Sequence, residues 1–178
     1  MHEERAEKME HALREQIHSV LALREYQIEA VGKCLAGNHI INLPTGTGKT
    51  LVAVKVIYYF LHRHPGNNVV FVVPTCALVR MSTSYLRKHS EIEGCTVAEL
   101  CGRELEGWDL SKWQECKRST KVLLGTPEVL RSSLVDRRYL LVADMSLCVF
   151  DECQYAVGSS PMACRLRDAL NSPQVAAV

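Results

Sequence analysis

Continuous apolar runs alternate along the chain with longer stretches in which apolar residues recur at helical spacing. A run that is apolar at every position is typical of a strand covered on both faces, as in a parallel sheet. Residues 69–73 form such a run, and we expect further strands at 39–43, 96–100, 121–125 and 146–150. Helices are predicted between them, at residues 23–36, 48–61, 76–89, 109–118, from 127 onward and at 161–170. This alternation predicts an α/β fold with a mostly parallel central sheet.

Turn and capping residues mark several of the predicted boundaries. Gly37 is expected as the C-cap of the first of these helices, because glycine readily adopts the conformations that end a helix. Pro74 and Thr75 end one strand and begin the next helix. Thr126 is predicted as an N-cap, with Pro127 at the first helical position, where a missing N–H breaks no helical hydrogen bond.

The two ends of the chain differ from its middle. Residues 1–20 are rich in helix formers, with apolar residues at i, i+4 and i+8, so we expect a helical leader there. Residues 21–178 are predicted to form one domain, because their length suffices for a single core. The apolar run at 174–178 has no turn residue after it, which indicates a segment of a longer protein.

Composition limits the partners and the compartment. The 178 residues carry a formal net charge of +1, so any nucleic-acid surface must be local. Eight cysteines are present, but no C-x-x-C pair, and Cys34 and Cys148 lie in apolar runs. We therefore predict a reducing intracellular compartment, cytoplasm or nucleus, and no structural zinc. No segment approaches the roughly 18 apolar residues of a membrane span, and the charged N-terminus is unlike a signal peptide.

The strongest chemical signal is the stretch 43–50, Leu-Pro-Thr-Gly-Thr-Gly-Lys-Thr, between an apolar run and a long helix. Glycines in such a loop let backbone N–H groups close around phosphate oxygens. Lys49 is placed to reach the β and γ phosphates, and the Thr50 hydroxyl to ligate Mg²⁺. The positive end of the following helix favours the same anion. The predicted phosphate-binding residues are Thr45, Gly46, Thr47, Gly48, Lys49 and Thr50.

The second signal is the pair Asp151-Glu152, directly after the apolar run 146–150. In a phosphate-loop protein, an Asp at the end of a strand holds Mg²⁺ opposite the Thr hydroxyl. The neighbouring Glu is placed to act as general base on the attacking water. We therefore predict Glu152, Lys49 and Asp151 as catalytic residues, and Thr50 with Asp151 as ligands of Mg²⁺.

The predicted nucleotide is ATP rather than GTP. Gln27 precedes the phosphate loop, and its planar amide offers both a donor and an acceptor to the edge of adenine. An Asn-Lys-x-Asp guanine signature does not occur anywhere in the chain.

Together these segments resemble the first RecA-like domain of superfamily 2 helicases. The corresponding stretches are 23–27 (Q motif), 43–50 (motif I), 73–75 with 78–79 (motif Ia), 125–128 (the Thr-Pro motif) and 151–154 (the Asp-Glu-x-x box). The resemblance implies a three-layer RecA-like P-loop fold that binds ATP and Mg²⁺, with nucleotide contacts from Arg24 and Gln27. The nucleic-acid contacts that it implies lie at Pro74, Thr75, Gly102, Arg103, Thr126 and Pro127.

The Asp-Glu-Cys triplet at 151–153 and the Arg-x-Tyr-Gln sequence at 24–27 resemble the Dicer and innate RNA-sensor branch. This resemblance implies an ATP-dependent RNA helicase or translocase that acts on double-stranded RNA. Position 154 is Gln where the branch usually has His, and Gln stands there in some other superfamily 2 groups. Two alternatives therefore stay open: a DNA translocase of a restriction or repair motor, and an ATP-gated RNA-binding sensor that does not unwind.

The resemblance also implies a partner domain. Residues 21–178 contain neither motif III nor the second RecA-like domain, which supplies arginine fingers to the γ-phosphate in this family. Arginine fingers accelerate phosphoryl transfer by ~10³-fold or more. We therefore expect ATP hydrolysis from the full-length protein and almost none from the isolated chain.

Overall fold

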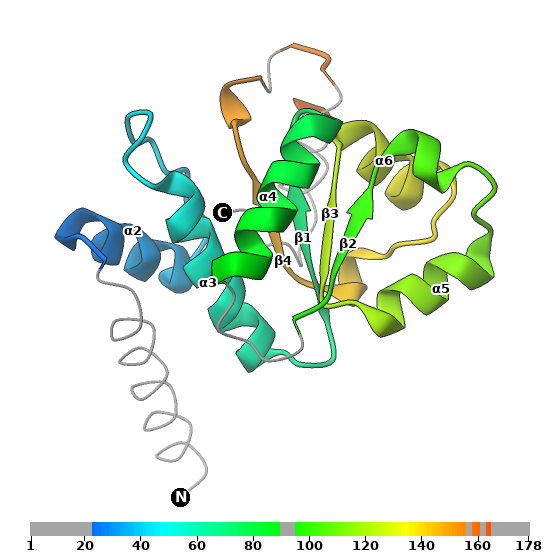
Figure 1. Cartoon of the computed structure of the whole chain (residues 1–178), viewed down its shortest axis with the longest axis horizontal. Helices are drawn as coiled ribbons and strands as arrows, with labels where there is room; N and C mark the ends of the chain where they lie inside the picture. The colour runs from blue at the N-terminus through cyan, green and yellow to red at the C-terminus, as the bar shows by residue number, and fades with distance from the viewer. Residues whose placement is uncertain (1–22, 90–94, 156–157, 161–162, 165–178) are drawn as a thin grey trace, which may run out of the picture.

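The computed structural model describes residues 23–89, 95–155, 158–160 and 163–164. Within these residues the centre is a parallel sheet of four strands in the order β2-β3-β1-β4 (Figure 1). The strands are β1 (Asn68–Val72), β2 (Val97–Leu100), β3 (Val122–Gly125) and β4 (Met145–Phe150). Because all of them run in one direction, their carboxyl ends meet at one edge of the sheet, where open α/β folds bind their ligands.

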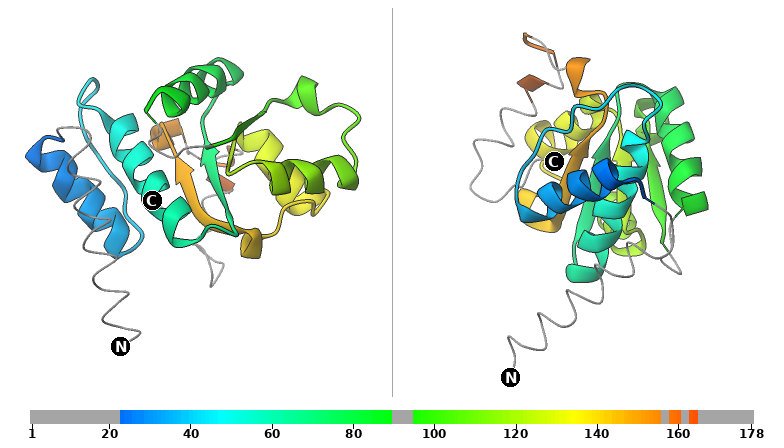
Figure 2. Two further views of the ribbon diagram at one scale, coloured as in Figure 1. Left: turned by 60° about the horizontal axis from the view of Figure 1, so that its bottom comes forward. Right: turned by 90° about the vertical axis from the view of Figure 1, so that its left-hand side faces the viewer.

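Helices cover both faces of this sheet (Figure 2). Those of the described residues are α2 (Glu25–Ala36), α3 (Lys49–Arg63), α4 (Cys76–His89), α5 (Leu110–Ser119) and α6 (Pro127–Arg131). Short 3-10 turns lie at η1 (Gly102–Leu105), η3 (Val142–Asp144) and η4 (Cys153–Tyr155), and a π-helical turn at η2 (Ser132–Asp136). α3 and α4 pack on one face and α5 and α6 on the other, which makes three layers.

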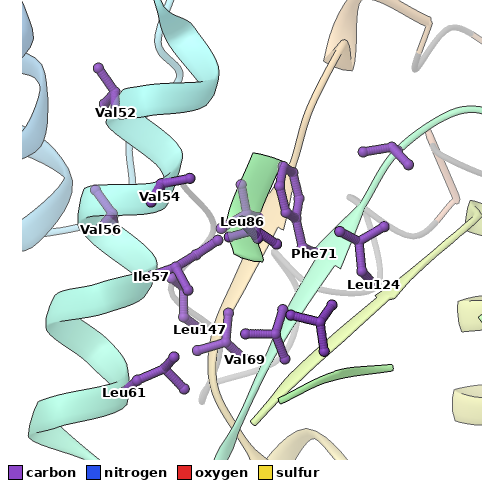
Figure 3. Close-up of a cluster of buried hydrophobic side chains, with 14 of the residues drawn as sticks. Val52, Val54, Val56, Ile57, Leu61, Val69, Phe71, Leu86, Leu124 and Leu147 are labelled. Atoms are coloured by element: carbon purple, nitrogen blue, oxygen red, sulfur yellow. The ribbon is translucent and has the colours of Figure 1, made fainter. Parts of the chain in front are cut away.

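Alternate residues of the central strands enter two different cores. Val69 and Phe71 of β1 belong to the cluster beneath α3 and α4, whereas Val70 and Val72 belong to the cluster beneath α5 and α6. Figure 3 shows the first cluster, in which side chains of α3 and α4 meet those of β1, β3 and β4. Burial on both faces explains the continuous apolar runs at 69–72 in β1 and 147–150 in β4, and the parallel sheet covered by helices confirms the predicted α/β class.

The run at 39–43 was predicted as a strand, and the described structure contradicts this prediction. Its residues join no strand pair, and the side chain of Ile40 is 84% exposed. Ile41 does lie against the first core cluster and lines a cavity beside the end of β4. A strand buried on both faces needs apolar contacts on both sides, and this run supplies them on one side only.

The other predicted elements between residues 23 and 155 are confirmed, with boundaries that shift by one or two residues. Gly37 and Thr126 occupy the predicted cap positions, although the Thr126 side chain makes no capping hydrogen bond. The predicted leader at 1–20 and the run at 174–178 lie outside the described residues. So does the predicted helix at 161–170, apart from residues 163–164.

Three other features of the described residues bear on the predictions: the cysteines, possible membrane spans and possible metal clusters. All eight cysteines are free thiols, and burial raises the pKa of Cys34 to about 11. Within the described ranges, no helix combines the length and the apolar character that a membrane span requires. The same part of the chain places no group of three or more His, Cys, Asp or Glu side chains where they could hold a metal ion.

Candidate functional site

The phosphate loop leads into the amino end of α3. Gly46 and Gly48 have φ angles of 81° and 86°, in the left-handed region that favours glycine. Gly48 is the N-cap of α3, and a Cβ atom there would lie 2.6 Å from Nε2 of Gln27. Position 48 therefore requires glycine for two reasons: its backbone conformation, and its close contact with a side chain of α2.

Two side chains of the loop bond to the loop's own carbonyl groups. The Lys49 ammonium donates to the Leu43 carbonyl oxygen at 3.1 Å, and the Thr47 hydroxyl donates to the Pro44 carbonyl oxygen at 2.6 Å. The loop is thus closed on itself, with Lys49 folded across it. A phosphate oxygen is a stronger acceptor for an ammonium group than a neutral carbonyl, so it would compete well for Lys49.

The first turn of α2 holds the loop through two donors. The Tyr26 hydroxyl and Nε2 of Gln27 both donate to the Thr47 carbonyl oxygen, at 2.9 and 2.8 Å. Oε1 of Gln27 accepts the Arg24 backbone N–H at 2.9 Å, and Nη1 of Arg24 donates to the Tyr26 hydroxyl at 3.3 Å. Tyr26 was not among the predicted site residues, and the signal that could have found it is its place directly before Gln27.

Gln27 is almost fully buried, with 5% of its surface exposed, yet its amide has bonding capacity left. A side-chain amide carries two N–H donors and two acceptor lone pairs. The contacts with Thr47 and Arg24 use one donor and one acceptor. Among the described residues no partner takes the remaining donor and acceptor, which are the pair that an adenine edge requires.

The acidic pair lies where β4 ends. The Asp151 N–H donates to the Val72 carbonyl oxygen at 2.9 Å, so the contact between β1 and β4 continues for one more residue. Oδ1 of Asp151 then accepts the N–H of Glu152 at 2.9 Å. Glu152 has a φ of 55°, which is uncommon for a residue with a side chain, and Nε2 of Gln154 donates to its Oε2. The chain therefore makes a tight turn here, and hydrogen bonds between the residues of the turn hold it.

One cavity of about 70 Å³ brings the phosphate loop and the acidic turn together. Its polar wall consists of Lys49, Asp151, Glu152 and Gln154, and the rest of Ile41, Val52, Ala53, Val149, Phe150 and Cys153. Burial raises the pKa of Asp151; the Glu152 N–H lowers it, the Glu152 carboxylate raises it, and the Lys49 ammonium lowers it. The three predicted catalytic side chains therefore line one cavity, although Lys49 is far in sequence from the adjacent pair Asp151 and Glu152.

The predicted nucleic-acid contacts follow three adjacent strands of the sheet. They are Pro74 and Thr75 after β1, Gly102 and Arg103 after β2, and Thr126 and Pro127 after β3. Thr75 is exposed, and its Oγ1 accepts the N–H of Leu78 at 3.3 Å at the start of α4. Thr126 and Pro127 are buried. The fold thus brings these positions to one edge of the sheet but exposes only some of their side chains.

A larger cavity, of about 570 Å³, lies at the opposite end of the sheet. Its lining includes Asn68 at the start of β1 and the basic residues Lys117 and Lys121. Lys117 is not available as a free cation, because it pairs with Asp144 at 2.7 Å. None of the predicted nucleotide-binding residues lines this cavity, so the smaller cavity is the candidate site.

The sequence as a whole matches a known family. The family described as DEAD/DEAH box helicase matches residues 24–173. Endoribonuclease Dicer homolog 2b of Oryza sativa subsp. japonica is 33% identical over 150 residues, which cover 82% of this chain and 11% of that protein. Endoribonuclease Dicer of Danio rerio is 30% identical over 151 residues, which cover 83% of this chain and 8% of that protein. The chain spans about a tenth of the length of these curated relatives.

Two solved structures share the architecture. The Hef helicase domain of Pyrococcus furiosus matches with a TM-score of 0.74 and 28% identity, over 89% of this chain and 32% of that chain. The UvsW helicase of bacteriophage T4 matches with a TM-score of 0.60 and 22% identity, over 80% of this chain and 48% of that chain. The second match concerns the fold alone, and both agree with a RecA-like layered α/β domain.

Proposed function

The chain belongs to the DEAD/DEAH box helicase family, and from that premise we propose that it is the ATP-hydrolysing domain of a Dicer-like helicase or translocase acting on double-stranded RNA. The observation that carries the proposal is the cavity shared by Lys49, Asp151 and Glu152. Phosphoryl transfer needs a cation for the phosphates, a carboxylate for the metal and a group that positions water. The relatives named Dicer, at 30 and 33% identity, support this branch of the family.

The phosphate loop would supply most of the binding. Gly46 and Gly48 leave the backbone uncrowded, so that N–H groups of the loop and of the first turn of α3 can donate to phosphate oxygens. Lys49 would exchange its contact with the Leu43 carbonyl oxygen for contacts with the β and γ phosphates. The exchange is favourable because both new partners are ionised.

The residues at this edge fit a magnesium ion. Thr50 offers a hydroxyl oxygen in the first turn of α3, and Asp151 offers a carboxylate oxygen at the end of β4. Mg²⁺ takes such oxygen ligands and usually needs only one or two carboxylates beside the substrate phosphates. Burial raises the pKa of Asp151, and a nearby cation favours its ionised form. When bound, the ion neutralises charge that develops on the phosphate oxygens.

Glu152 would act on the attacking water. A proton passes from the water to the Glu152 carboxylate while the water oxygen bonds to the γ-phosphorus. The bond from the γ-phosphorus to the bridging oxygen breaks, and its electron pair leaves with ADP, which yields inorganic phosphate. Glu152 suits this role because it lines the same cavity as Lys49 and is only partly buried, so water reaches it.

Gln27 and Arg24 would recognise the nucleotide base. The donor and the acceptor left on the Gln27 amide match the edge of adenine, and the other pair keeps its hold on Thr47 and Arg24. Arg24 contributes through its backbone N–H, which donates to Oε1 of Gln27 and so orients the amide. ATP is therefore the proposed nucleotide.

The RNA backbone would lie along the carboxyl edge of β1, β2 and β3. Thr75 and the free N–H groups at the start of α4 can donate to phosphates, and Gly102 with Arg103 follows β2. Thr126 and Pro127 are buried, so their contribution would come from the backbone. A second RecA-like domain is the proposed partner that completes both the RNA surface and the γ-phosphate site.

The test is ATP hydrolysis by the full-length protein with duplex RNA, single-stranded RNA and duplex DNA. We expect the largest stimulation by duplex RNA, and we expect Glu152→Gln to abolish it while ATP still binds. Glu115→Gln, the same change at an exposed residue of α5, is the matched control and should behave as wild type. Stimulation by DNA alone would indicate a DNA translocase. Binding of duplex RNA without stimulated hydrolysis would indicate a sensor.

A further inference from the structure

The Gln154 amide contacts the carboxylate that the proposed mechanism uses as base: its Nε2 donates to Oε2 of Glu152. We propose that Gln154 is a positioning residue for hydrolysis, which holds one oxygen of the Glu152 carboxylate so that the other is presented to the attacking water. The inference rests on the proposed function, because it assigns a role beside the same base.

The turn after β4 fixes the backbone of Glu152 but leaves its carboxylate to be ordered by other contacts. Asp151 is bound on both sides, through its N–H to the Val72 carbonyl oxygen and through Oδ1 to the N–H of Glu152. Several rotatable bonds separate the Glu152 backbone from the carboxylate, and ordering them has an entropic cost. A donor to one carboxylate oxygen limits that freedom, and Gln154 supplies such a donor.

The chemical type of the donor matters. Lys49 lines the same cavity, but its ammonium donates to the Leu43 carbonyl oxygen, and it is the group proposed to meet the phosphates. The Gln154 amide is neutral, so it can orient Glu152 without adding a positive charge that would compete with water for both oxygens. In this cavity the Lys49 ammonium would therefore bind the substrate phosphates, and the neutral Gln154 amide would orient the Glu152 carboxylate.

Gln154 has little part in holding the fold together. Its side chain is exposed, it lies in the short turn η4, and it belongs to neither core cluster. Exposed substitutions away from caps and cores usually change stability very little. A loss of activity at this position would therefore report on the Glu152 carboxylate rather than on unfolding.

The test measures duplex-RNA-stimulated ATP hydrolysis by the full-length protein. Gln154→Glu keeps the size but replaces the donor by an acceptor, and Gln154→Ala removes it. Gln114→Ala is the matched control, because Gln114 is an exposed glutamine of α5 that lines the cavity at the opposite end of the sheet. We expect kcat to fall about 2- to 10-fold for both variants at 154, as for one lost hydrogen bond. The KM for ATP and the melting temperature should not change.

The split between kcat and KM separates positioning from a structural effect. A residue that only orients the Glu152 carboxylate lowers kcat and leaves the KM for ATP unchanged, whereas a distorted site changes both. A change in KM in place of kcat, or a wild-type kcat for both variants at 154, would overturn the inference.

Glu152→Gln distinguishes this inference from the proposed function. If Glu152→Gln hydrolyses ATP at the normal rate, the base lies elsewhere and both proposals fail. If Glu152→Gln is inactive while both variants at 154 hydrolyse ATP as wild type does, only the positioning role fails. Inactive Glu152→Gln together with a lowered kcat at 154 supports both.

Discussion

The proposed nucleotide half and the proposed nucleic-acid half of the sheet's carboxyl edge are built differently. In the first, the Gln27 side chain of α2 holds the Thr47 carbonyl of the phosphate loop, and Gln154 holds Glu152 within the turn after β4. In the second, Thr75 is exposed but Thr126 and Pro127 are buried. The domain therefore orders the proposed nucleotide site with its own residues, whereas the proposed nucleic-acid surface would offer mainly backbone groups and need a partner domain.

The largest expected effect separates the isolated chain from the full-length protein. We predict hydrolysis ~10³-fold slower for the isolated 178 residues, because the proposed second domain would supply arginine fingers to the γ-phosphate. Duplex RNA should also bind weakly, since Lys and Arg neutralisation supplies most non-specific affinity and the net charge is +1. Single-turnover assays and filter binding at about 50 and about 200 mM salt measure both. Submicromolar binding at the higher salt, or RNA-stimulated hydrolysis, would show a self-sufficient domain.

Lys49→Ala should affect the nucleotide half alone. It removes a charge-assisted contact of about 1.5–3 kcal/mol, which corresponds to about 10- to 150-fold in the Kd for ATP. Calorimetry with Mg²⁺ measures the ATP affinity, and filter binding of the full-length protein should give an unchanged affinity for duplex RNA. Lys33→Ala, at an exposed lysine of α2 that pairs with Glu29, is the control. Equal losses for ATP and RNA would mean that the two halves are not separable.

Gly48→Ala should reduce the free energy of unfolding by about 1–3 kcal/mol, because it forces a Cβ into a left-handed conformation. The new Cβ would also displace the Gln27 amide from the loop. Gly32→Ala is the contrast: a Cβ at Gly32 in α2 meets no atom within 4 Å, so we expect stabilisation of up to about 1 kcal/mol. Urea unfolding measures both changes. A Gly48→Ala protein as stable as wild type would show that the contact between α2 and the loop restrains little.

The smallest expected effects compare two threonines of the nucleic-acid half. Thr75→Ala removes an exposed hydroxyl at the start of α4, so affinity for duplex RNA should fall by about 2- to 10-fold, as for one hydrogen bond. Thr126→Ala alters a buried side chain and should leave that affinity unchanged. Filter binding of the full-length protein measures both variants. A larger loss for Thr126→Ala would mean that this residue turns outward when RNA binds.

The sequence was sufficient for the strands and for the position of the acidic pair. Residues 69–73 and 147–150 are apolar at every position because both faces of a central strand are buried, and that pattern is visible without a structure. Asp151 and Glu152 follow such a strand directly, so their place at the carboxyl edge could be predicted. The contrast is the run at 39–43, where two neighbouring isoleucines resemble a strand but only Ile41 reaches the core.

The contacts that organise the site could not be predicted from spacing. Tyr26 and Gln27 reach Thr47 because α2 packs beside α3, and the direction of their side chains depends on that packing. The burial of Thr126 depends likewise on what covers the end of β3. The contact between Gln154 and Glu152 is close in sequence, yet it requires the left-handed conformation of Glu152, which nothing in the residue types indicates.

The two donors on the Thr47 carbonyl oxygen bear on how a nucleotide is sensed. If Gln27 binds adenine while it holds this carbonyl, the base and the triphosphate share one restraint. Linkage then requires that occupancy by the base change the affinity of the loop for phosphates by the same factor as phosphates change the affinity for the base. Adenosine and inorganic triphosphate added together as separate molecules should therefore change each other's affinity by that factor. The intact nucleotide would thus act on this domain as a single signal, before any second domain closes over it.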